Sequence, residues 1–148
     1  MSKKVMLSIA CVLVFAALGA IPAQAGTVFI SQYYEGVSNN KWIELYNATE
    51  STVDLAAGVY KMASFNNANR EAWKTNGTPT TTFTLTGSVA AASTYLTGHG
   101  SATNPIYAVK DQILTWAFNG DDTVILFTGA TFSVDNIVDT FGWTAASG

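Results

Sequence analysis

Cysteine is nearly missing from the sequence, with Cys11 as its single occurrence in 148 residues. Residues 1–25 have the pattern of a secretory signal, in which a positively charged start precedes an apolar run and an A-x-A cleavage site ends at Ala25. A transmembrane anchor is disfavoured, because the run ends at Pro22 and small residues without a polar stop-transfer flank. Cleavage would leave residues 26–148 as one cysteine-free domain, which excludes a disulfide scaffold, a thiolate metal site and a cysteine nucleophile.

Basic residues are scarce as well. The whole chain has seven Lys and Arg against ten Asp and Glu, a net charge of −3. Removing Lys3 and Lys4 with the signal leaves five basic residues against ten acidic ones, a net charge of −5. Non-specific affinity for nucleic acid comes mainly from Lys and Arg, so the composition excludes a basic patch that wraps DNA. The acidic balance is typical of a protein that stays soluble outside the cell or weakly attracts cations.

Histidine also occurs only once, as His99 between two glycines. A catalytic triad needs an orienting acid and a nucleophile, and the sequence contains no G-x-S-x-G motif. One His without any Cys is also a poor metal site. Nothing places the acidic residues Glu35, Glu44 and Asp54 at the separation that glycoside hydrolysis requires. We therefore predict that this chain has no catalytic residues.

Helical periodicity is almost absent, whereas Thr, Val, Ile and aromatic residues are abundant and Gly, Asn and Asp recur about every ten residues. This pattern predicts an all-β sandwich or barrel. A single helical turn is conceivable only at 69–74, which is too short to be stable alone. The expected strands and apolar segments are 27–34, 41–46, 53–55, 59–65, 81–85, 94–97, 113–118, 123–128 and 132–141.

The Asn119-Gly120-Asp121-Asp122 motif lies between two of these apolar segments and predicts a turn. We expect Gly120 to need a positive φ, so that a Val there costs about 1–3 kcal/mol. Asp121 and Asp122 are the candidate metal ligands, for Ca²⁺, but two carboxylates supply too few oxygens. The favoured interpretation is structural, with the Asp side chains accepting backbone N–H bonds in the turn.

Aromatic side chains are the candidates for a stacking platform. Trp116 alternates with Leu114 and Phe118, which favours burial in the core. Tyr33 and Tyr34 are consecutive, so one of them must face outward from its strand. We interpret Trp73, in the irregular segment 66–79, as the best exposed of the four tryptophans, the others being Trp42, Trp116 and Trp143. The candidate binding residues are therefore Trp73, Tyr33 and Tyr34.

Two Asn residues, Asn47 and Asn76, match the N-x-[ST] pattern for N-glycosylation, as Asn47-Ala48-Thr49 and Asn76-Gly77-Thr78. In a bacterial protein both matches are due to chance.

Four motifs together resemble the bacterial branch of the lamin tail domain family. Residues 29–47, FISQYYEGVSNNKWIELYN, are similar to its opening I-S-E-Y…E-G-S-S-N-N-K…I-E-I-Y-N pattern. The motifs that follow are Val53-Asp54-Leu55 for V-D-L, 116–122 for W-F-N-G-D-D, and 138–142 for V-D-x-F/I-G. Their order and spacing agree over about residues 27–142.

The resemblance implies an immunoglobulin-like β-sandwich without catalytic residues of its own. Bacterial members of the family look like accessory modules of secreted proteins, often before an endonuclease/exonuclease/phosphatase-type catalytic domain. Gln32 stands where the family usually has Glu, which puts an acidic role there in doubt. Family members also continue into a further strand where this chain stops at Gly148, so we expect either a sandwich without its last strand or a fragment of a longer protein.

Three functional hypotheses remain open. The first is a secreted, non-catalytic interaction or accessory module. The second is the N-terminal fragment of a secreted metal-dependent nuclease. The third is surface adhesion or glycan binding through Trp73, Tyr33 or Tyr34. The partner could be a protein, extracellular DNA or a glycan, and no cofactor is expected apart from the Ca²⁺ considered above. The expected location is extracellular or periplasmic, and no transmembrane segment is expected after signal cleavage.

Overall fold

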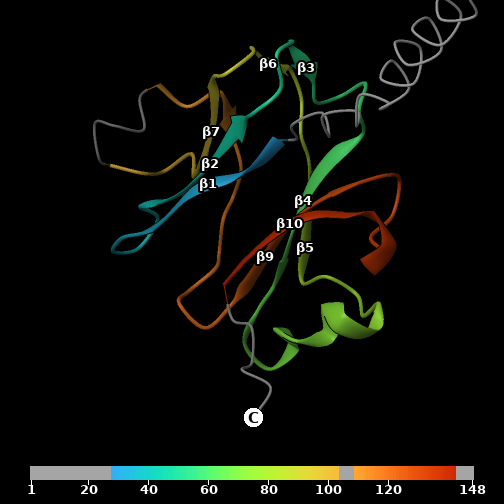
Figure 1. Cartoon of the computed structure of the whole chain (residues 1–148). Helices are drawn as coiled ribbons and strands as arrows, with labels where there is room; N and C mark the ends of the chain where they lie inside the picture. The colour runs from blue at the N-terminus through green and yellow to red at the C-terminus, as the bar shows by residue number, and fades with distance from the viewer. Residues whose placement is uncertain (1–27, 104–108, 143–148) are drawn as a thin grey trace, which may run out of the picture.

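Alternating apolar residues form two four-stranded β-sheets that pack face to face (Figure 1). The computed structural model describes residues 28–103 and 109–142. The expected signal at 1–25, Trp143 and the chain end at Gly148 lie outside the described residues. The β-sandwich architecture predicted from the sequence is confirmed.

The first sheet has the strand order β1-β2-β7-β8 and the second β10-β9-β4-β5. All neighbouring strands are antiparallel except β7 and β8. The first sheet consists of β1 (Val28–Glu35), β2 (Lys41–Asn47), β7 (Thr94–Gly98) and β8 (Gln112–Ile113). The second consists of β10 (Ile137–Gly142), β9 (Thr123–Thr128), β4 (Tyr60–Phe65) and β5 (Thr81–Thr84). The described residues also form the β3 (Val53–Asp54) and β6 (Ser88–Val89) pair and the 3-10 helices η2 (Asn67–Asn69), η3 (Ala72–Thr75) and η5 (Val134–Asn136).

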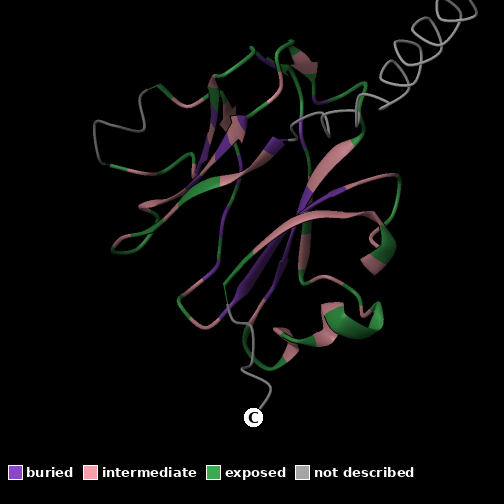
Figure 2. Ribbon diagram, in the orientation of Figure 1, coloured by how far each residue is buried: buried purple, intermediate pink, exposed green. Residues whose placement is uncertain are grey.

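The two sheets differ in how their outer faces are covered. Strand β9 is buried on both faces, because Val124 and Leu126 enter the core between the sheets while Ile125 and Phe127 enter a second cluster outside it. Figure 2 shows β9 as a buried strand, whereas β1 is largely exposed or half-buried. The middle of the second sheet is therefore covered on both faces, and the outer face of the first sheet is the open face of the sandwich.

Side chains close both sides of the sandwich. On one side, Gln112 at the edge of the first sheet donates to Thr84 O (2.9 Å) and accepts from Thr86 N (3.1 Å) beside the second sheet. On the other, Asp139 on β10 accepts a hydrogen bond from Ile30 N on β1 (2.8 Å). Unpaired edge groups invite association with other chains, and these bonds satisfy some of them within the domain.

The segment expected to be a strand at 113–118 is mostly not one. Only Gln112–Ile113 pairs, with β7 in the first sheet, and the chain then crosses to the second sheet, where it begins β9. Leu114, Trp116 and Phe118 still point into the core, with exposed fractions of 6%, 2% and 0%. The expected burial of Trp116 is thus confirmed, although its segment lacks a hydrogen-bonded partner strand.

The 119–122 turn therefore joins two sheets rather than two paired strands, and the prediction for Gly120 is wrong. Gly120 does not have a positive φ, whereas Gly87, Gly129 and Gly142 do. A Cβ at Gly120 would meet only Glu35 Oε2, at an ordinary 3.6 Å. A crossover between sheets does not require the left-handed backbone of a two-residue hairpin, so the expected strain of a Val at Gly120 disappears.

Candidate functional site

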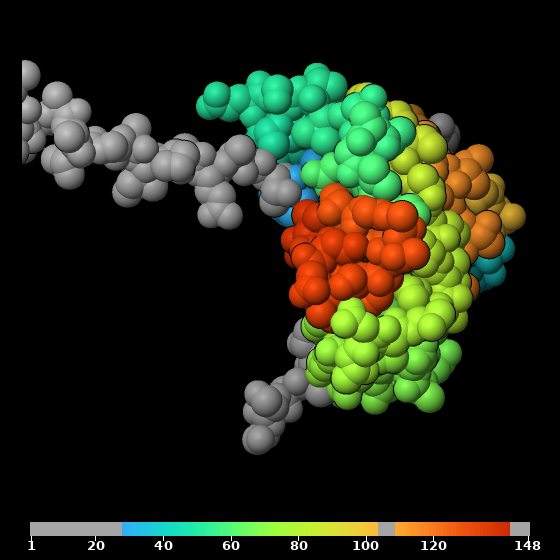
Figure 3. All heavy atoms as spheres, turned by 90° about the vertical axis from the view of Figure 1, so that its right-hand side faces the viewer, coloured from blue at the N-terminus to red at the C-terminus, as the bar shows by residue number. Residues whose placement is uncertain are grey.

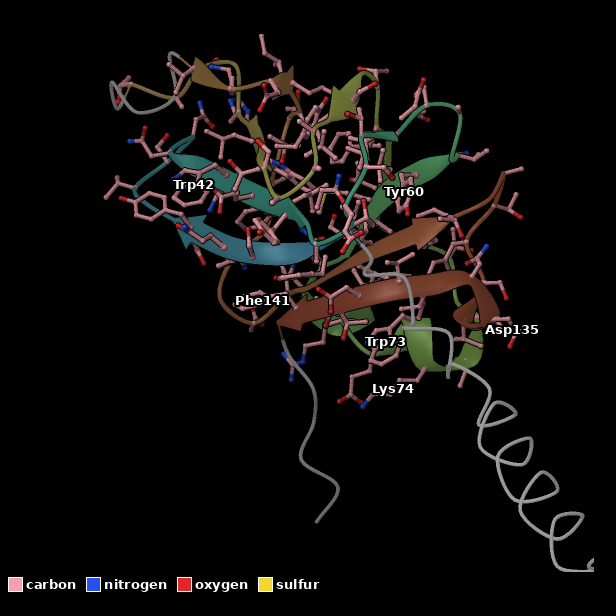
Figure 4. All side chains as sticks on the ribbon, turned by 45° about the horizontal axis from the view of Figure 1, so that its top comes forward. Trp42, Tyr60, Trp73, Lys74, Asp135 and Phe141 are labelled. Atoms are coloured by element: carbon pink, nitrogen blue, oxygen red, sulfur yellow. The ribbon has the colours of Figure 1, made fainter. Side chains whose placement is uncertain are left out.

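The outer face of the first sheet, defined by the outward residues of β1, β2 and β7, is rich in aromatic side chains. Two of its rows are Tyr34–Trp42–Gly98 and Phe29–Tyr46–Thr94, with Gln32–Glu44–Leu96 between them. The rings of Tyr34 and Trp42 stack with centroids 5.5 Å apart and planes 13° from parallel. Those of Phe29 and Tyr46 lie 5.6 Å apart. Figure 4 shows Trp42 on this sheet, away from Trp73.

A β-bulge sets which tyrosine belongs to this face. The pairing of β1 with β2 shifts between Ile30 and Gln32, and the extra residue, Ser31, donates to Glu44 Oε1 (2.8 Å). Beyond the bulge, Tyr34 faces outward and is 39% exposed, while Tyr33 turns toward the core. The prediction that one of the two tyrosines faces outward is confirmed.

A groove of about 340 Å³ lies on this outer face. Its aromatic wall is Trp42, and two carboxylates, Glu44 and Asp111, lie along it. Asp111 is held in place because its Oδ2 accepts from Leu96 N (2.7 Å) and its own N–H donates to Leu96 O (2.8 Å). The lining residues are Gln32, Trp42, Glu44, Thr94, Leu96, Val109 and Asp111.

Trp42 is not among the binding residues predicted from the sequence. The signal was present, since the alternation in 41–46 places Trp42 opposite the buried Ile43 and Leu45. The chemistry of the groove combines a flat apolar wall with hydrogen-bonding groups, which is typical of small-ligand sites.

Tyr33 packs against the core between the two sheets, at the end of the sandwich where Phe118 and Phe141 lie. Its ring lies 4.6 Å from those of both Phe118 and Phe141, and its hydroxyl donates to Glu35 Oε2 (3.1 Å). Burial, followed by the negative charge of Glu35 and then of Asp122, raises the pKa of Tyr33 well above its ordinary value. Tyr33 thus contributes to packing at this end, rather than to the outer face.

We expect stability to fall at alkaline pH because of Tyr33. The folded state keeps the phenolic proton at a pH where an unfolded tyrosine, with a pKa of about 10, releases it. The urea midpoint should therefore stay level below about pH 9 and decline above about pH 10. In Tyr33→Phe the urea midpoint should decline less steeply with pH. Burial also raises the pKa of Tyr95, so Tyr95 accounts for part of the decline that persists in the variant. An equally steep decline in parent and variant would contradict this assignment.

Trp73 covers the second sheet instead of presenting an exposed platform, which corrects the expectation of its exposure. It lies on η3, is half-buried, and packs with Phe132 over the cluster of Ala63, Phe65, Ile125 and Phe127. Lys74 Nζ lies 5.8 Å from its ring centroid, and Figure 4 shows the two on the same helix. The irregular composition of 66–79 suggested a free loop, but the segment folds back over apolar surface.

A second hollow, of about 420 Å³, lies beside this segment. In Figure 3 the orange-red residues near 130 lie directly above the yellow-green residues of the 67–80 segment. None of the described residues lining the hollow is charged, so it offers little to orient a polar ligand. They are Asn76, Gly77, Thr78, Pro79, Thr82, Ala130, Thr131 and Phe132.

The candidate metal ligands Asp121 and Asp122 hold two loops together. Asp122, only 4% exposed, accepts from Asn119 N (2.8 Å) and from Asn67 N (2.6 Å). Asp121 forms an ion pair with Arg70 (3.1 Å). The structural interpretation of Asp122 in its turn is thus confirmed, and within 28–103 and 109–142 no cluster of three or more His, Cys, Asp or Glu could hold a metal ion.

The remaining polar candidates lie at separate places. His99 Nδ1 accepts from Ser101 N (3.0 Å) within its loop. Glu35 pairs with Lys41 (3.5 Å), and Asp54 accepts from the backbone of the turn that follows it. No helix among the described residues has the length and apolar character to cross a membrane.

The family model of the Lamin Tail Domain matches residues 21–145, a range that includes every described residue. No curated protein matches the chain.

Proposed function

Because the chain belongs to the lamin tail domain family, an immunoglobulin-like β-sandwich family, we propose that it is a secreted, non-catalytic module that binds a partner through the outer face of its first sheet. The observation that carries the proposal is the Tyr34–Trp42 stack with the groove beside it. A contiguous group of aromatic side chains on an open sheet face is typical of a surface that binds a partner.

The difference between the two sheets supports this choice of surface. The outer face of the second sheet is occupied by its own chain, through Trp73, Phe132 and their segments. Within the described residues, the outer face of the first sheet has no such covering element, and its row of Phe29, Tyr46, Tyr34 and Trp42 is half-buried or exposed. An accessory module needs one open recognition surface on a stable scaffold, and this arrangement provides it.

The secretory pattern of residues 1–25 supports export, and with it a role at the cell surface or in the medium. Bacterial origin and association with an extracellular nuclease are further parts of the proposal that rest on the sequence resemblance. These two parts concern the organism and the longer protein to which the domain would belong, and the choice of the outer face as binding surface does not depend on them.

A turnover assay tests the non-catalytic part of the proposal. The full chain, incubated with DNA, RNA and a phosphodiester in Mg²⁺ or Ca²⁺, is expected to show no hydrolysis above buffer. The described residues contain no cluster of three or more His, Cys, Asp or Glu that could hold the metal ion such hydrolysis would use. Turnover that persists at constant specific activity through successive purification steps would refute this part.

A further inference from the structure

We propose, on the basis of the binding role proposed above, that the groove at Trp42 takes a segment of an uncharged polysaccharide. Its volume of about 340 Å³ is at the lower end of the range for small-ligand sites, about 300–1,000 Å³. A groove of this volume can hold a short segment of a sugar chain. The rest of the chain would lie along the open sheet face.

Trp42 provides the apolar half of the recognition. Pyranose rings have a face of C–H groups that packs on a flat aromatic ring, and Trp offers the largest such ring. Trp42 lines the groove whereas its stacking partner Tyr34 does not, so the ring is supported by Tyr34 and still accessible from the groove. A ring that is already fixed loses little conformational entropy when a ligand binds.

Two fixed carboxylates provide the polar half. Glu44 is oriented by Ser31 and Asp111 by the backbone of Leu96, each through one carboxylate oxygen. Within the described part of the chain, Glu44 Oε2 and Asp111 Oδ1 accept no hydrogen bond. Ionised carboxylates only accept, and sugar hydroxyls are donors that match them. Gln32 and Thr94 add groups that both donate and accept.

Charge selects an uncharged polymer over an anionic one. None of the described residues lining the groove is Lys or Arg, and the whole chain has a net charge of −3. Glu44 and Asp111 would repel phosphates or uronic acids brought to the same place. Base stacking on Trp42 therefore lacks the phosphate contacts that provide most of the affinity for single-stranded nucleic acid.

The test is affinity electrophoresis of the full chain in gels that contain one polymer each. The uncharged probes are hydroxyethyl cellulose, mixed-linkage β-glucan, galactomannan and neutral arabinoxylan, and the anionic probes are polygalacturonate and single-stranded DNA. At least one uncharged polymer should retard the chain. Trp42→Ala should weaken that binding at least about tenfold. The double variant Glu44→Gln with Asp111→Asn should weaken it several-fold while leaving the sheet intact.

Phe141→Ala is the matched control, because it removes a 44% exposed aromatic ring from β10 in the other sheet. It should change the retardation less than twofold. Trp42→Phe keeps a ring in the stack and separates loss of fold from loss of binding, so its affinity should lie between those of parent and Trp42→Ala. Circular dichroism of each variant confirms that the compared chains are folded.

The outcomes separate this inference from the proposed function. If no uncharged polymer retards the chain, or if Trp42→Ala is retarded as strongly as the parent, the polysaccharide inference is overturned. Two other results would assign the outer face to another partner. The chain could bind single-stranded DNA in the gel, or it could self-associate as measured by light scattering. In either case, loss of that behaviour in Trp42→Ala would show that the outer face is the binding surface. If Trp42→Ala changes none of these readouts, the outer-face proposal fails as well.

Discussion

Replacing Asn47 with Ala is expected to lower the free energy of unfolding by about 3–5 kcal/mol, a large share of the roughly 5–15 kcal/mol of a domain this size. Asn47 ends β2 and is fully buried. Its Nδ2 donates to Ser51 O (2.8 Å), Val89 O (3.0 Å) and Ala90 O (3.0 Å). Its Oδ1 accepts from the N–H (2.9 Å) and hydroxyl (2.7 Å) of Thr49.

Alanine would remove the side-chain partner of Val89 O, Ala90 O and Thr49 N, whereas Ser51 O keeps the Thr49 hydroxyl as donor. Each buried polar group left unsatisfied costs about 1–3 kcal/mol. The urea midpoint of the variant measures the loss. Asn39→Ala is the matched control, because Asn39 lies in an exposed loop and no side-chain hydrogen bond is found for it within the described residues. We expect the control to stay within about 0.5 kcal/mol of the parent. A loss below about 1 kcal/mol in Asn47→Ala would mean that water replaces the side chain without penalty.

The same residue shows how a short motif can mislead. Asn47-Ala48-Thr49 has the pattern of a glycosylation site, yet the nitrogen that would carry the glycan is buried among three carbonyl oxygens. The bond from Thr49 N to Asn47 Oδ1 is the local Asx-turn that an Asn at a strand end favours. That part was predictable as a turn after residue 46. The contacts with Val89 and Ala90, more than forty residues away, were not.

The strands were predicted well where alternation and pairing agree. The alternation in 41–46 places Ile43 and Leu45 on one face, which the structure shows to be the core face, and β2 pairs on both sides. At 114–118 the alternation again gave the correct buried face, but the backbone has no ladder partner. Periodicity reports which side chains turn inward, whereas pairing depends on which sheet the chain enters next.

The candidate site was predicted only in part, for a related reason. Tyr34 was nominated and is exposed, but Trp73 was preferred to Trp42. An irregular, polar segment was expected to leave Trp73 free, yet tertiary packing places it over Phe65 and Phe127. The groove also needs Asp111, which comes to Trp42 only because β8 runs parallel to β7. No local pattern around Asp111 indicates that neighbour.

Gly142→Ala is expected to lower the free energy of unfolding by about 2–6 kcal/mol. Gly142 has a φ of +116°, which L side chains rarely adopt, and such backbone strain costs about 1–3 kcal/mol. An added Cβ would also overlap Asp122 O and lie 3.0 Å from Thr123 Cα on the paired strand. Both are backbone atoms, so β10 would have to move away from β9, with a further cost of about 1–3 kcal/mol.

Gly120→Ala is the matched control for this prediction, and it reverses the expectation drawn from the sequence. Its Cβ would meet only Glu35 Oε2 at 3.6 Å, and its φ is not positive, so we expect a change within about 0.5 kcal/mol. The Asn-Gly signal marked Gly120 as the constrained glycine, whereas the constraint lies at the glycine that ends the V-D-x-F-G motif. Thermal melts of the two variants decide between these positions. Equal melting temperatures for the two variants would show that β10 shifts freely at Gly142. A lower melting temperature in Gly142→Ala alone would show that the close approach of β10 to Asp122 fixes the end of the second sheet.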